Sequence, residues 1–456
     1  MNETNSNSTQ KVIRTEAPPP GKLGKSELYA LSIGQVIGAG IITLVGPGIA
    51  YTGQSVWLAY AVAVLYGFVM IMPLLFVTST LRLGGGYYSL LAGLGNEKLA
   101  GMYAFAFLVQ LIQMSLYGVS LGVYVNSIFP SVRPQIVGIV ALTVFYVINF
   151  FGVDIMAKAQ KAMTWFLLTA LIVFIIIGFT RLENPVWNIS APNFFSNGFS
   201  GFKGAVFLFA YSCWGYSMTM NYGKDAKNAK KDIPWVMIVS MPTILIVYCG
   251  IAVVGSGVLP IDMVANQPLT LVARTILNPV FFTLFIIGGP IVALMTTINS
   301  SMAYYCIPIA QSCEDGWLPK SWAKTNKHGA SVRILTIVYL VGLIPLIFNL
   351  NVTTITNNML LLYSVFAFLY TVAYLKLPKK YETAWKKSKY HIPDGAYYFI
   401  VILSFLAYAA IFVNALMSLS PIISGISLGA IGICLALGLL RSKNPDIRVV
   451  TTVWDD

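Results

Sequence analysis

Long apolar blocks separated by short polar segments make up most of the chain. Each block has about 20 residues, the length at which an α-helix rising 1.5 Å per residue crosses about 30 Å of hydrocarbon. The pattern predicts membrane-spanning helices at residues 28–52, 55–81, 99–129, 134–151, 162–180, 201–222, 233–258, 280–313, 334–348, 353–375, 396–416 and 421–440. The expected fold class is therefore an all-α integral membrane protein with twelve transmembrane helices.

The composition fits a protein whose solvent is a lipid bilayer. Of the 456 residues, 57% are hydrophobic and 10% are charged. Soluble domains carry charge on about a quarter of their residues. Membrane lipids are therefore the expected surroundings, and a cell membrane is the expected location.

The distribution of basic residues predicts the orientation. If the amino terminus lies in the cytoplasm, four of the 29 lysines and arginines fall on the outer side: Arg133, Arg181, Lys203 and Arg274. Cytoplasmic loops of membrane proteins carry the excess of basic residues, so both termini are expected in the cytoplasm. The net charge of +13 is thus a topology signal, and no nucleic-acid partner is expected.

Polar segments flank the apolar blocks at both ends of the chain. Residues 1–26 are polar, contain three consecutive prolines and end near the basic residues Lys22 and Lys25. This composition predicts a disordered cytoplasmic tail. Residues 442–456 are expected to form a second cytoplasmic tail.

Two of the predicted spans contain segments that weaken a continuous helix. The first span contains Gly34, Gly38 and Gly40, and the sixth contains Ser-Cys-Trp-Gly at 212–215. Backbone amides in hydrocarbon need partners, so a broken helix indicates a cavity lined by protein or water. Close packing of small residues against a neighbouring helix is the alternative. Breaks at corresponding places in two halves of a chain favour the binding site of a transporter.

A pair of broken helices can recognise an amino acid through its backbone. Amides at the start of a half-helix attract a carboxylate, and carbonyls at the end of a half-helix attract an amine. The expected groups are the amides around Ala39, Gly40 and Ile41, and the carbonyls near Ile37 and from Tyr211 through Ser212 to Cys213. None of the 29 basic and 16 acidic residues falls in the middle of a predicted span, so backbone dipoles are the strong polar groups there.

Four short motifs occur in a fixed order along the chain. Gly-Ala-Gly-Ile-Ile lies at 38–42, Gly-Gly-Tyr-Tyr at 85–88, Asp-Ala-Lys-Asn-Ala-Lys-Lys-Asp-Ile-Pro at 225–234, and Asp-Gly-Trp-Leu-Pro at 315–319. In these motifs the chain resembles the amino acid-polyamine-organocation (APC) superfamily, and it is similar to bacterial L-type amino acid transporters. The resemblance extends from about residue 24 to residue 440.

The resemblance implies a specific arrangement of the helices. Helices 1–5 are expected at 27–180 and helices 6–10 at 201–376, as a five-plus-five inverted repeat with broken helices 1 and 6. Two additional helices are expected at 396–441. The resemblance also implies alternating access to a central site between helices 1, 3, 6, 8 and 10.

Several side chains next to the breaks are implied to contact the substrate. Tyr211 lies where such transporters often have an aromatic gate, and Trp214 and Gly215 lie beside it. Arginine–agmatine antiporters, which resemble this chain, have an acidic residue and a tryptophan where it has Ser217 and Ser301. The two serines therefore count against arginine–agmatine exchange.

Uncharged polar residues in the spans are further candidates for the site. Gln35 in helix 1 and Gln113 in helix 3 are expected to face the cavity, or else to bridge helices by hydrogen bonds. Thr296, Thr297 and Ser300 in helix 8 provide hydroxyls that are candidates for a sodium site facing helix 1. Such hydroxyls more often bond to their own backbone. Exchange of one substrate for another requires no sodium site and is the default expectation.

The sequence contains no pattern that indicates an enzyme or a metal site. An intramembrane enzyme would need paired acids, histidines or a nucleophile with its base, and no such set of catalytic residues is found. The five cysteines form no metal-ligand cluster with His328 or His391. We therefore expect no enzyme activity, no metal and no cofactor.

The expected function is secondary active transport of amino acids by alternating access, as an exchanger of neutral amino acids. The alternatives are a cationic amino acid or amine antiporter, whose aromatic walls would hold the cation, and a proton- or sodium-coupled amino acid symporter. A sensor that binds substrate without moving it is a rival from another class. The partner is a small-molecule amino acid or amine, and the oligomeric state stays open.

Overall fold

Helices make up most of the computed structural model, which describes residues 12–14, 16–210, 212–347 and 352–455. The α-helices are α1 (Lys25–Val36), α2 (Ala39–Thr52), α3 (Val56–Thr80), α4 (Gly86–Leu90), α5 (Glu97–Gln110), α6 (Gln113–Ile128), α7 (Pro134–Phe150), α8 (Val153–Phe179), α9 (Gly198–Ala210), α10 (Ala229–Gly257), α11 (Ile261–Val264), α12 (Thr270–Ile276), α13 (Pro279–Ile286), α14 (Val292–Glu314), α15 (Val332–Ile347), α16 (Val352–Tyr374), α17 (Leu377–Lys380), α18 (Glu382–Lys387), α19 (Asp394–Ser418) and α20 (Pro421–Arg441). The 3-10 helices are η1 (Gly53–Ser55), η3 (Gly215–Tyr222) and η5 (Lys320–Ala323), and the π-helical turns are η2 (Leu91–Gly95) and η4 (Ile287–Ile291). The strands are β1 (Val12–Arg14), β2 (Arg82–Leu83), β3 (Val449–Thr451) and β4 (Val453–Trp454).

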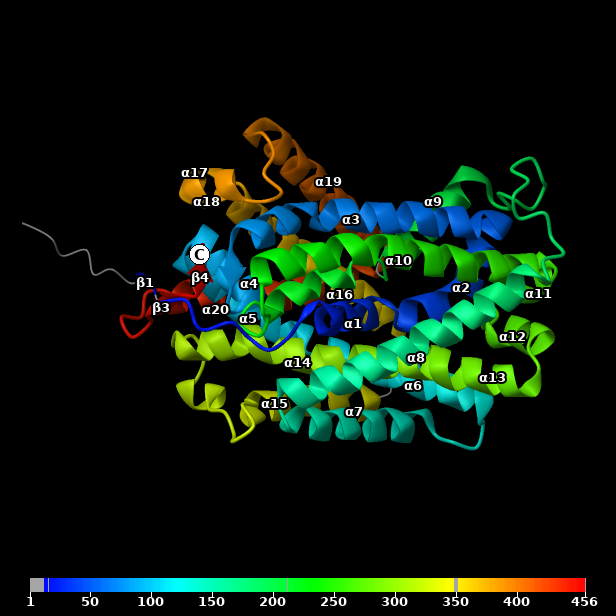
Figure 1. The fold of residues 1–456 in the computed structure, drawn as a ribbon, viewed down its shortest axis with the longest axis horizontal. Helices are drawn as coiled ribbons and strands as arrows, with labels where there is room; N and C mark the ends of the chain where they lie inside the picture. Colours follow the sequence, from blue (N-terminus) through cyan, green and yellow to red (C-terminus); the bar gives the residue numbers. More distant parts are fainter. Residues whose placement is uncertain (1–11, 15, 211, 348–351, 456) are drawn as a thin grey trace, which may run out of the picture.

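The long helices run roughly along the longest axis of the molecule (Figure 1). Strands β1, β3 and β4 and the carboxyl terminus lie at one end of this bundle, which we call the terminal end, and α11 and α12 lie at the other. Helix α1 occupies the half of the bundle nearer the terminal end, and α2 continues from it into the other half.

The expected all-α membrane fold class is confirmed. Eight helical stretches among the described residues are long and apolar enough to cross a bilayer, and α7 and α15 are shorter apolar helices that pack against each other. The first expected span is divided into α1 and α2, and the sixth is divided into α9 and η3. None of these four helices reaches the length of about 20 residues that a crossing needs. The count of twelve spans and the inverted repeat therefore remain predictions.

The outer surface of the bundle is apolar where lipid would contact it. On α19 and α20 the side chains of Met417, Ile422 and Ile426 are 82%, 74% and 68% exposed. A soluble protein rarely exposes such a continuous apolar surface. The surface therefore fits lipid rather than water as its neighbour.

Short strands at the terminal end were not expected. Strand β1 pairs in parallel with β3, and β2 pairs antiparallel with β4. The Trp454 side chain is buried, and the guanidinium of Arg82 lies 5.5 Å from the centre of its ring. Strand β1 lies inside the segment expected to be a disordered tail. Two or three residues per strand are too few for a recognisable alternation of apolar and polar positions.

Candidate functional site

The first interruption separates α1 from α2 at Ile37 and Gly38. Ile37 has φ −77° and ψ 83°, and Gly38 has φ −132° and ψ −140°, so both leave the helical region. A β-carbon at Gly38 would lie 2.3 Å from Thr297 Oγ1 on α14. Glycine is thus required here because the backbone at the break lies directly against another helix.

The second interruption separates α9 from η3. After the last turn of α9, the Ser212 amide donates to the Phe209 carbonyl at 2.9 Å, and the Cys213 amide donates to the Ala210 carbonyl at 3.2 Å. A β-carbon at Gly215 would lie 3.0 Å from the carbonyl oxygen of Gln35. The two interruptions therefore lie next to each other in the centre of the bundle.

A single buried hydroxyl connects the two interruptions. Tyr248 on α10 is completely buried, and its Oη lies 2.7 Å from the Val36 carbonyl oxygen and 3.1 Å from the Ser212 carbonyl oxygen. Val36 ends α1, and Ser212 lies in the segment that follows α9. The tyrosine proton is shared between carbonyls of both breaks, and this sharing fixes their separation.

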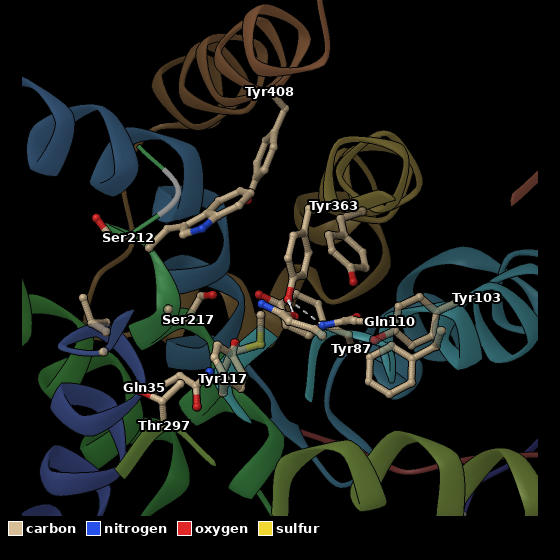
Figure 2. Close-up of a pocket in the computed structure, with 18 residues that line it drawn as sticks. Gln35, Tyr87, Tyr103, Gln110, Tyr117, Ser212, Ser217, Thr297, Tyr363 and Tyr408 are labelled. Atoms are coloured by element: carbon tan, nitrogen blue, oxygen red, sulfur yellow. Dashed lines mark hydrogen bonds between the residues drawn. The ribbon is translucent and has the colours of Figure 1, made fainter. Parts of the chain in front are cut away.

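A cavity opens beside the two breaks (Figure 2). It holds about 790 Å³ of space not filled by atoms, including the part that is open to solvent, and the centre of a water molecule can reach about 60 Å³ of it. Its lining residues are Gln35, Val36, Gly38, Tyr87, Tyr103, Phe107, Gln110, Gln113, Tyr117, Ser212, Trp214, Gly215, Ser217, Met218, Thr297, Tyr363, Tyr370 and Tyr408.

The cavity is aromatic and uncharged. Six tyrosines, one tryptophan and one phenylalanine line it together with three glutamines, and no described lining residue is charged. Trp214 stands between two of these tyrosines, with ring centres 5.4 Å from Tyr363 and 5.3 Å from Tyr408. Its walls thus offer ring faces, hydroxyls and amides to a ligand.

Hydroxyls of α14 contact the end of α1. Thr296 Oγ1 and Thr297 Oγ1 lie 3.2 and 3.0 Å from the Gly34 carbonyl oxygen, and both also lie within 3.0 Å of the Ala293 carbonyl of their own helix. The expected facing of helix 8 hydroxyls and helix 1 carbonyls is therefore present. In this arrangement the hydroxyls act as hydrogen-bond donors to those carbonyls.

Two serines of α14 orient the side chain of Gln35. Ser300 Oγ and Ser301 Oγ donate to Gln35 Oε1 at 2.6 and 3.2 Å. The amide oxygen is thus held against α14, and the Nε2 group of this half-buried glutamine is left on the other side. Ser301 supports a lining residue without itself lining the cavity.

The predicted site residues divide into three groups. Eight line the cavity: Gln35, Gly38, Gln113, Ser212, Trp214, Gly215, Ser217 and Thr297. Ile37, Ile41, Cys213, Thr296, Ser300 and Ser301 are buried beside it. Ala39 and Gly40 form the first turn of α2, and Tyr211 lies outside the described residues.

A polar network lies where α5 meets α6. Gln110 Nε2 donates to Tyr304 Oη at 3.3 Å and to Tyr363 Oη at 2.8 Å. Gln113 Oε1 accepts from Tyr305 Oη at 2.9 Å and also from Tyr363 Oη. Tyr363 of α16 therefore bridges both glutamines, as the dashed lines in Figure 2 indicate for the residues drawn there.

An irregular turn places these glutamines. The amides of Leu111 and Ile112 bond to carbonyls three residues earlier, and Ser115 Oγ donates to the Ile112 carbonyl at 2.5 Å. No glycine or proline marks this turn, so the sequence predicted one continuous helix. Gln110 was missed for that reason, although it lies three residues before Gln113 and such spacing puts two side chains on one face of a helix.

The other unpredicted lining residues are mostly tyrosines. They are Val36, Tyr87, Tyr103, Phe107, Tyr117, Met218, Tyr363, Tyr370 and Tyr408. The spacing of Tyr363 and Tyr370, seven residues apart on α16, was an available signal because it repeats on one helix face. Aromatic residues are so common in this chain that the spacing alone did not distinguish cavity from packing.

Buried acids lie at the terminal end and not among the described cavity-lining residues. Asp315, which follows α14, accepts from Tyr88 Oη at 2.5 Å and from the Val450 amide at 3.2 Å. Burial raises the pKa of Asp315 to about 6, and burial also raises the pKa of Asp225 to about 6. Asp315 thereby connects the end of α14 with α4 and with strand β3.

Comparison with known proteins identifies the family. Residues 23–430 match the family described as amino acid permeases. The chain belongs to the amino acid permease family. This membership indicates a transporter rather than an enzyme, and it identifies amino acid transport across a membrane as the general activity.

Relatives of this permease are distant in sequence. It is 24% identical over 370 residues to the uncharacterised protein MJ0609 of Methanocaldococcus jannaschii, covering 76% of this chain and 81% of that protein. It is 21% identical to the general amino acid permease AGP3 of Saccharomyces cerevisiae, covering 71% of this chain and 61% of AGP3. It is 22% identical to the branched-chain amino acid permease BcaP of Bacillus subtilis, covering 67% of this chain and 70% of BcaP.

Proposed function

We propose that this permease is an exchanger of neutral amino acids that works by alternating access. The observation that carries the proposal is the pair of helix interruptions, tied together by Tyr248 and facing an uncharged cavity. Amino acid transport as such follows from the family. The substrate class, the exchange mode and the site residues are the proposed part.

The interruptions provide both poles that a zwitterion needs. The first amides of α2, from Ala39 to Ile41, have no partner within their own helix and carry the positive end of its dipole. The Val36 carbonyl accepts from both Tyr248 and the Gly38 amide, whereas the Ser212 carbonyl uses one lone pair for Tyr248 and keeps a second for a further donor. A substrate carboxylate would bind at the amides, and its ammonium group would bind at the Ser212 carbonyl.

The cavity walls favour a neutral side chain. A cation without a paired anion is costly to bury, and no described lining residue offers a carboxylate. Aromatic faces can offset part of that cost, so a cationic amino acid or amine is the second candidate. The aromatic lining supports it, as does the similarity, 24% identity over 390 residues, to the cationic amino acid transporter 7 of Arabidopsis thaliana.

Exchange is favoured over sodium symport by the contacts of α14. The Thr296 and Thr297 hydroxyls already satisfy the Gly34 carbonyl as donors. A sodium ion would need those oxygens to turn their lone pairs toward it. We further propose that the protein lies in the cell membrane with the terminal end in the cytoplasm, as the distribution of basic residues predicts.

Counterflow into proteoliposomes tests the proposal. Vesicles loaded with one unlabelled amino acid should take up a labelled neutral amino acid, without a sodium or proton gradient. Uptake of lysine or a decarboxylated amine alone would overturn the neutral substrate class, and uptake that requires a gradient would overturn exchange. Substrate binding without any counterflow would instead indicate a sensor.

Two glycine variants test whether the break between α1 and α2 forms the binding site. Gly38→Ala introduces a β-carbon 2.3 Å from Thr297 Oγ1, whereas Gly432→Ala on α20 meets nothing within 4 Å. We expect Gly38→Ala to weaken substrate binding about tenfold or more, since overpacking of this kind costs roughly 1–3 kcal/mol. Gly432→Ala should bind like the parent. Equal affinity of both variants would contradict the placement of the site.

A further inference from the structure

The side chain of Gln110 has an acceptor oxygen, Oε1, that is available to a ligand in the cavity. It is 2% exposed, and its Nε2 group donates to Tyr304 and Tyr363. No described residue donates to its Oε1. Tyr363 gives its own proton to Gln113 Oε1, so its oxygen is the acceptor for Gln110. The orientation of the Gln110 amide is thereby fixed, and Oε1 is left as an acceptor in the wall of the cavity.

One aromatic ring connects Gln110 with the second helix interruption. The Tyr363 hydroxyl lies 2.8 Å from Gln110 Nε2, and the centre of its ring lies 5.4 Å from the ring centre of Trp214. Trp214 directly precedes Gly215, where η3 begins. Tyr363 thus bridges Trp214, beside the break, and Gln110 in the cavity wall. A substrate bound at the break would reach Gln110 with the end of a long side chain.

The surroundings of Gln110 define which side chain would fit. Ring centres of Tyr103 and Phe107, its neighbours on α5, lie 5.1 Å apart, and both residues line the same cavity. Ring faces accept a flat or apolar body, while a buried carbonyl oxygen needs an N–H or O–H donor. No acid lines the described part of the cavity to neutralise a cation. A phenol, an indole or a primary amide satisfies all three conditions.

We propose that Gln110 Oε1 and the rings around it form a side-chain subsite that selects long neutral amino acids with a hydrogen-bond donor near the end of the side chain. Tyrosine, tryptophan and glutamine have such side chains. The inference rests on the proposed function, because it assumes an amino acid held at the helix interruptions. It adds the chemistry by which one neutral amino acid is preferred to another.

Matched ligand pairs test the subsite on the full-length purified protein. Each pair differs in the terminal donor: tyrosine and phenylalanine, tryptophan and its benzothienyl analogue, glutamine and glutamate γ-methyl ester. The donor-bearing member of each pair should bind about tenfold more tightly, because its partner leaves a buried acceptor unpaired. Ratios near one in all three pairs would overturn the subsite. Absence of binding by every amino acid would instead overturn the proposed function.

Two glutamine variants test whether Gln110 causes the preference for ligands with a side-chain donor. Gln110→Met keeps the approximate volume and removes the acceptor, so the affinity ratios should fall to within about twofold. Gln54→Met is the matched control, since Gln54 is similarly buried, at 3% exposed, and also has an unpaired Oε1 among the described residues, but does not line the cavity. It should keep the parental ratios. If Gln110→Met keeps the parental affinity ratios, another group must recognise the side-chain donor of the ligand.

If Gln110→Met fails to fold, Gln110→Glu provides the second measurement. It keeps an acceptor oxygen at the same position and adds the capacity for negative charge. The donor preference should persist, and lysine should gain affinity relative to the parent by about tenfold or more, as expected for a paired charge. A loss of the donor preference without any gain for lysine would contradict the subsite.

Discussion

Removal of the Tyr248 hydroxyl tests whether the two helix interruptions act as one binding site. The change Tyr248→Phe deletes the donor that lies 2.7 Å from the Val36 carbonyl and 3.1 Å from the Ser212 carbonyl. The ring itself should remain in place, because it is completely buried and packs edge-on against Tyr60 at 5.3 Å. The perturbation is therefore confined to one proton and the two carbonyls that share it.

The magnitude follows from the cost of an unpaired buried acceptor. One shared hydroxyl proton contributes a net of roughly 0.5–1.5 kcal/mol, and a carbonyl left without any donor costs about 1–3 kcal/mol. The Val36 carbonyl keeps its bond from the Gly38 amide at 2.9 Å, so the second cost applies to the Ser212 carbonyl. A substrate ammonium would relieve part of that cost, but it would meet carbonyls that are no longer held at a fixed separation. We expect a net loss of about 1.4 kcal/mol, which is a tenfold rise in the dissociation constant.

Titration of the detergent-purified protein with its best substrate measures this constant, and counterflow gives the transport rate. Tyr60→Phe is the matched control, because the Tyr60 hydroxyl is buried in the same region and has no hydrogen-bond partner among the described residues. That variant should bind at least as tightly as the parent. Parental affinity in Tyr248→Phe, or an equal loss in both variants, would refute the argument that Tyr248 positions the site.

Further predictions concern the terminal end and the wall of α14. Trp454→Ala removes a buried ring beneath Arg82 and should cost about 3 kcal/mol of stability, measured as a lower apparent melting temperature. Trp165→Ala, at a side chain that is 50% exposed, should change it less, and an equal effect would argue against a stabilising role of strand β4. The pKa of Asp315 is raised from 3.8 to about 6, so the folded state binds the proton more tightly than the unfolded state. The contribution of Asp315 to stability should therefore be fully present below about pH 4 and be lost as the pH rises through about 6, and Asp315→Asn should flatten this part of the profile. Ser300→Ala removes the 2.6 Å bond to Gln35 and should weaken binding about threefold to tenfold; unchanged affinity would show that Gln35 does not depend on Ser300.

Glycine was the most informative residue in the sequence because it reports on the backbone. A β-carbon would clash with Thr297 Oγ1 at Gly38 and would lie in tight contact with the Gln35 carbonyl at Gly215, and the structure interrupts its helices at both places. Such close approaches are encoded locally, so the sequence alone located them. The polar segments between the apolar blocks could be predicted equally well, since hydrocarbon excludes charge from the middle of a span.

The wall of the cavity was less predictable for a physical reason. Tyr87 comes from α4, Tyr363 from α16 and Tyr408 from α19, and only the packing of distant helices brings them together. The chain holds 25 tyrosines, and a lining tyrosine looks the same in sequence as a tyrosine that contacts lipid. The strands at the terminal end were not predicted because their pairing partners lie hundreds of residues apart in the sequence.

Backbone and side chains thus contribute separately to recognition in the proposed site. The helix interruptions depend on glycines and on Tyr248, whereas the far end of the cavity depends on the α5–α6 turn and on Tyr363. A change such as Gly38→Ala should then weaken all amino acids by a similar factor, and Gln110→Met should change only their order. The double variant should show the sum of the two free-energy changes, because sites without shared partners are additive within about 0.5 kcal/mol. A larger coupling would mean that the cavity rearranges as a unit, and that side-chain recognition is transmitted through Tyr363 and Trp214 to the backbone of the break.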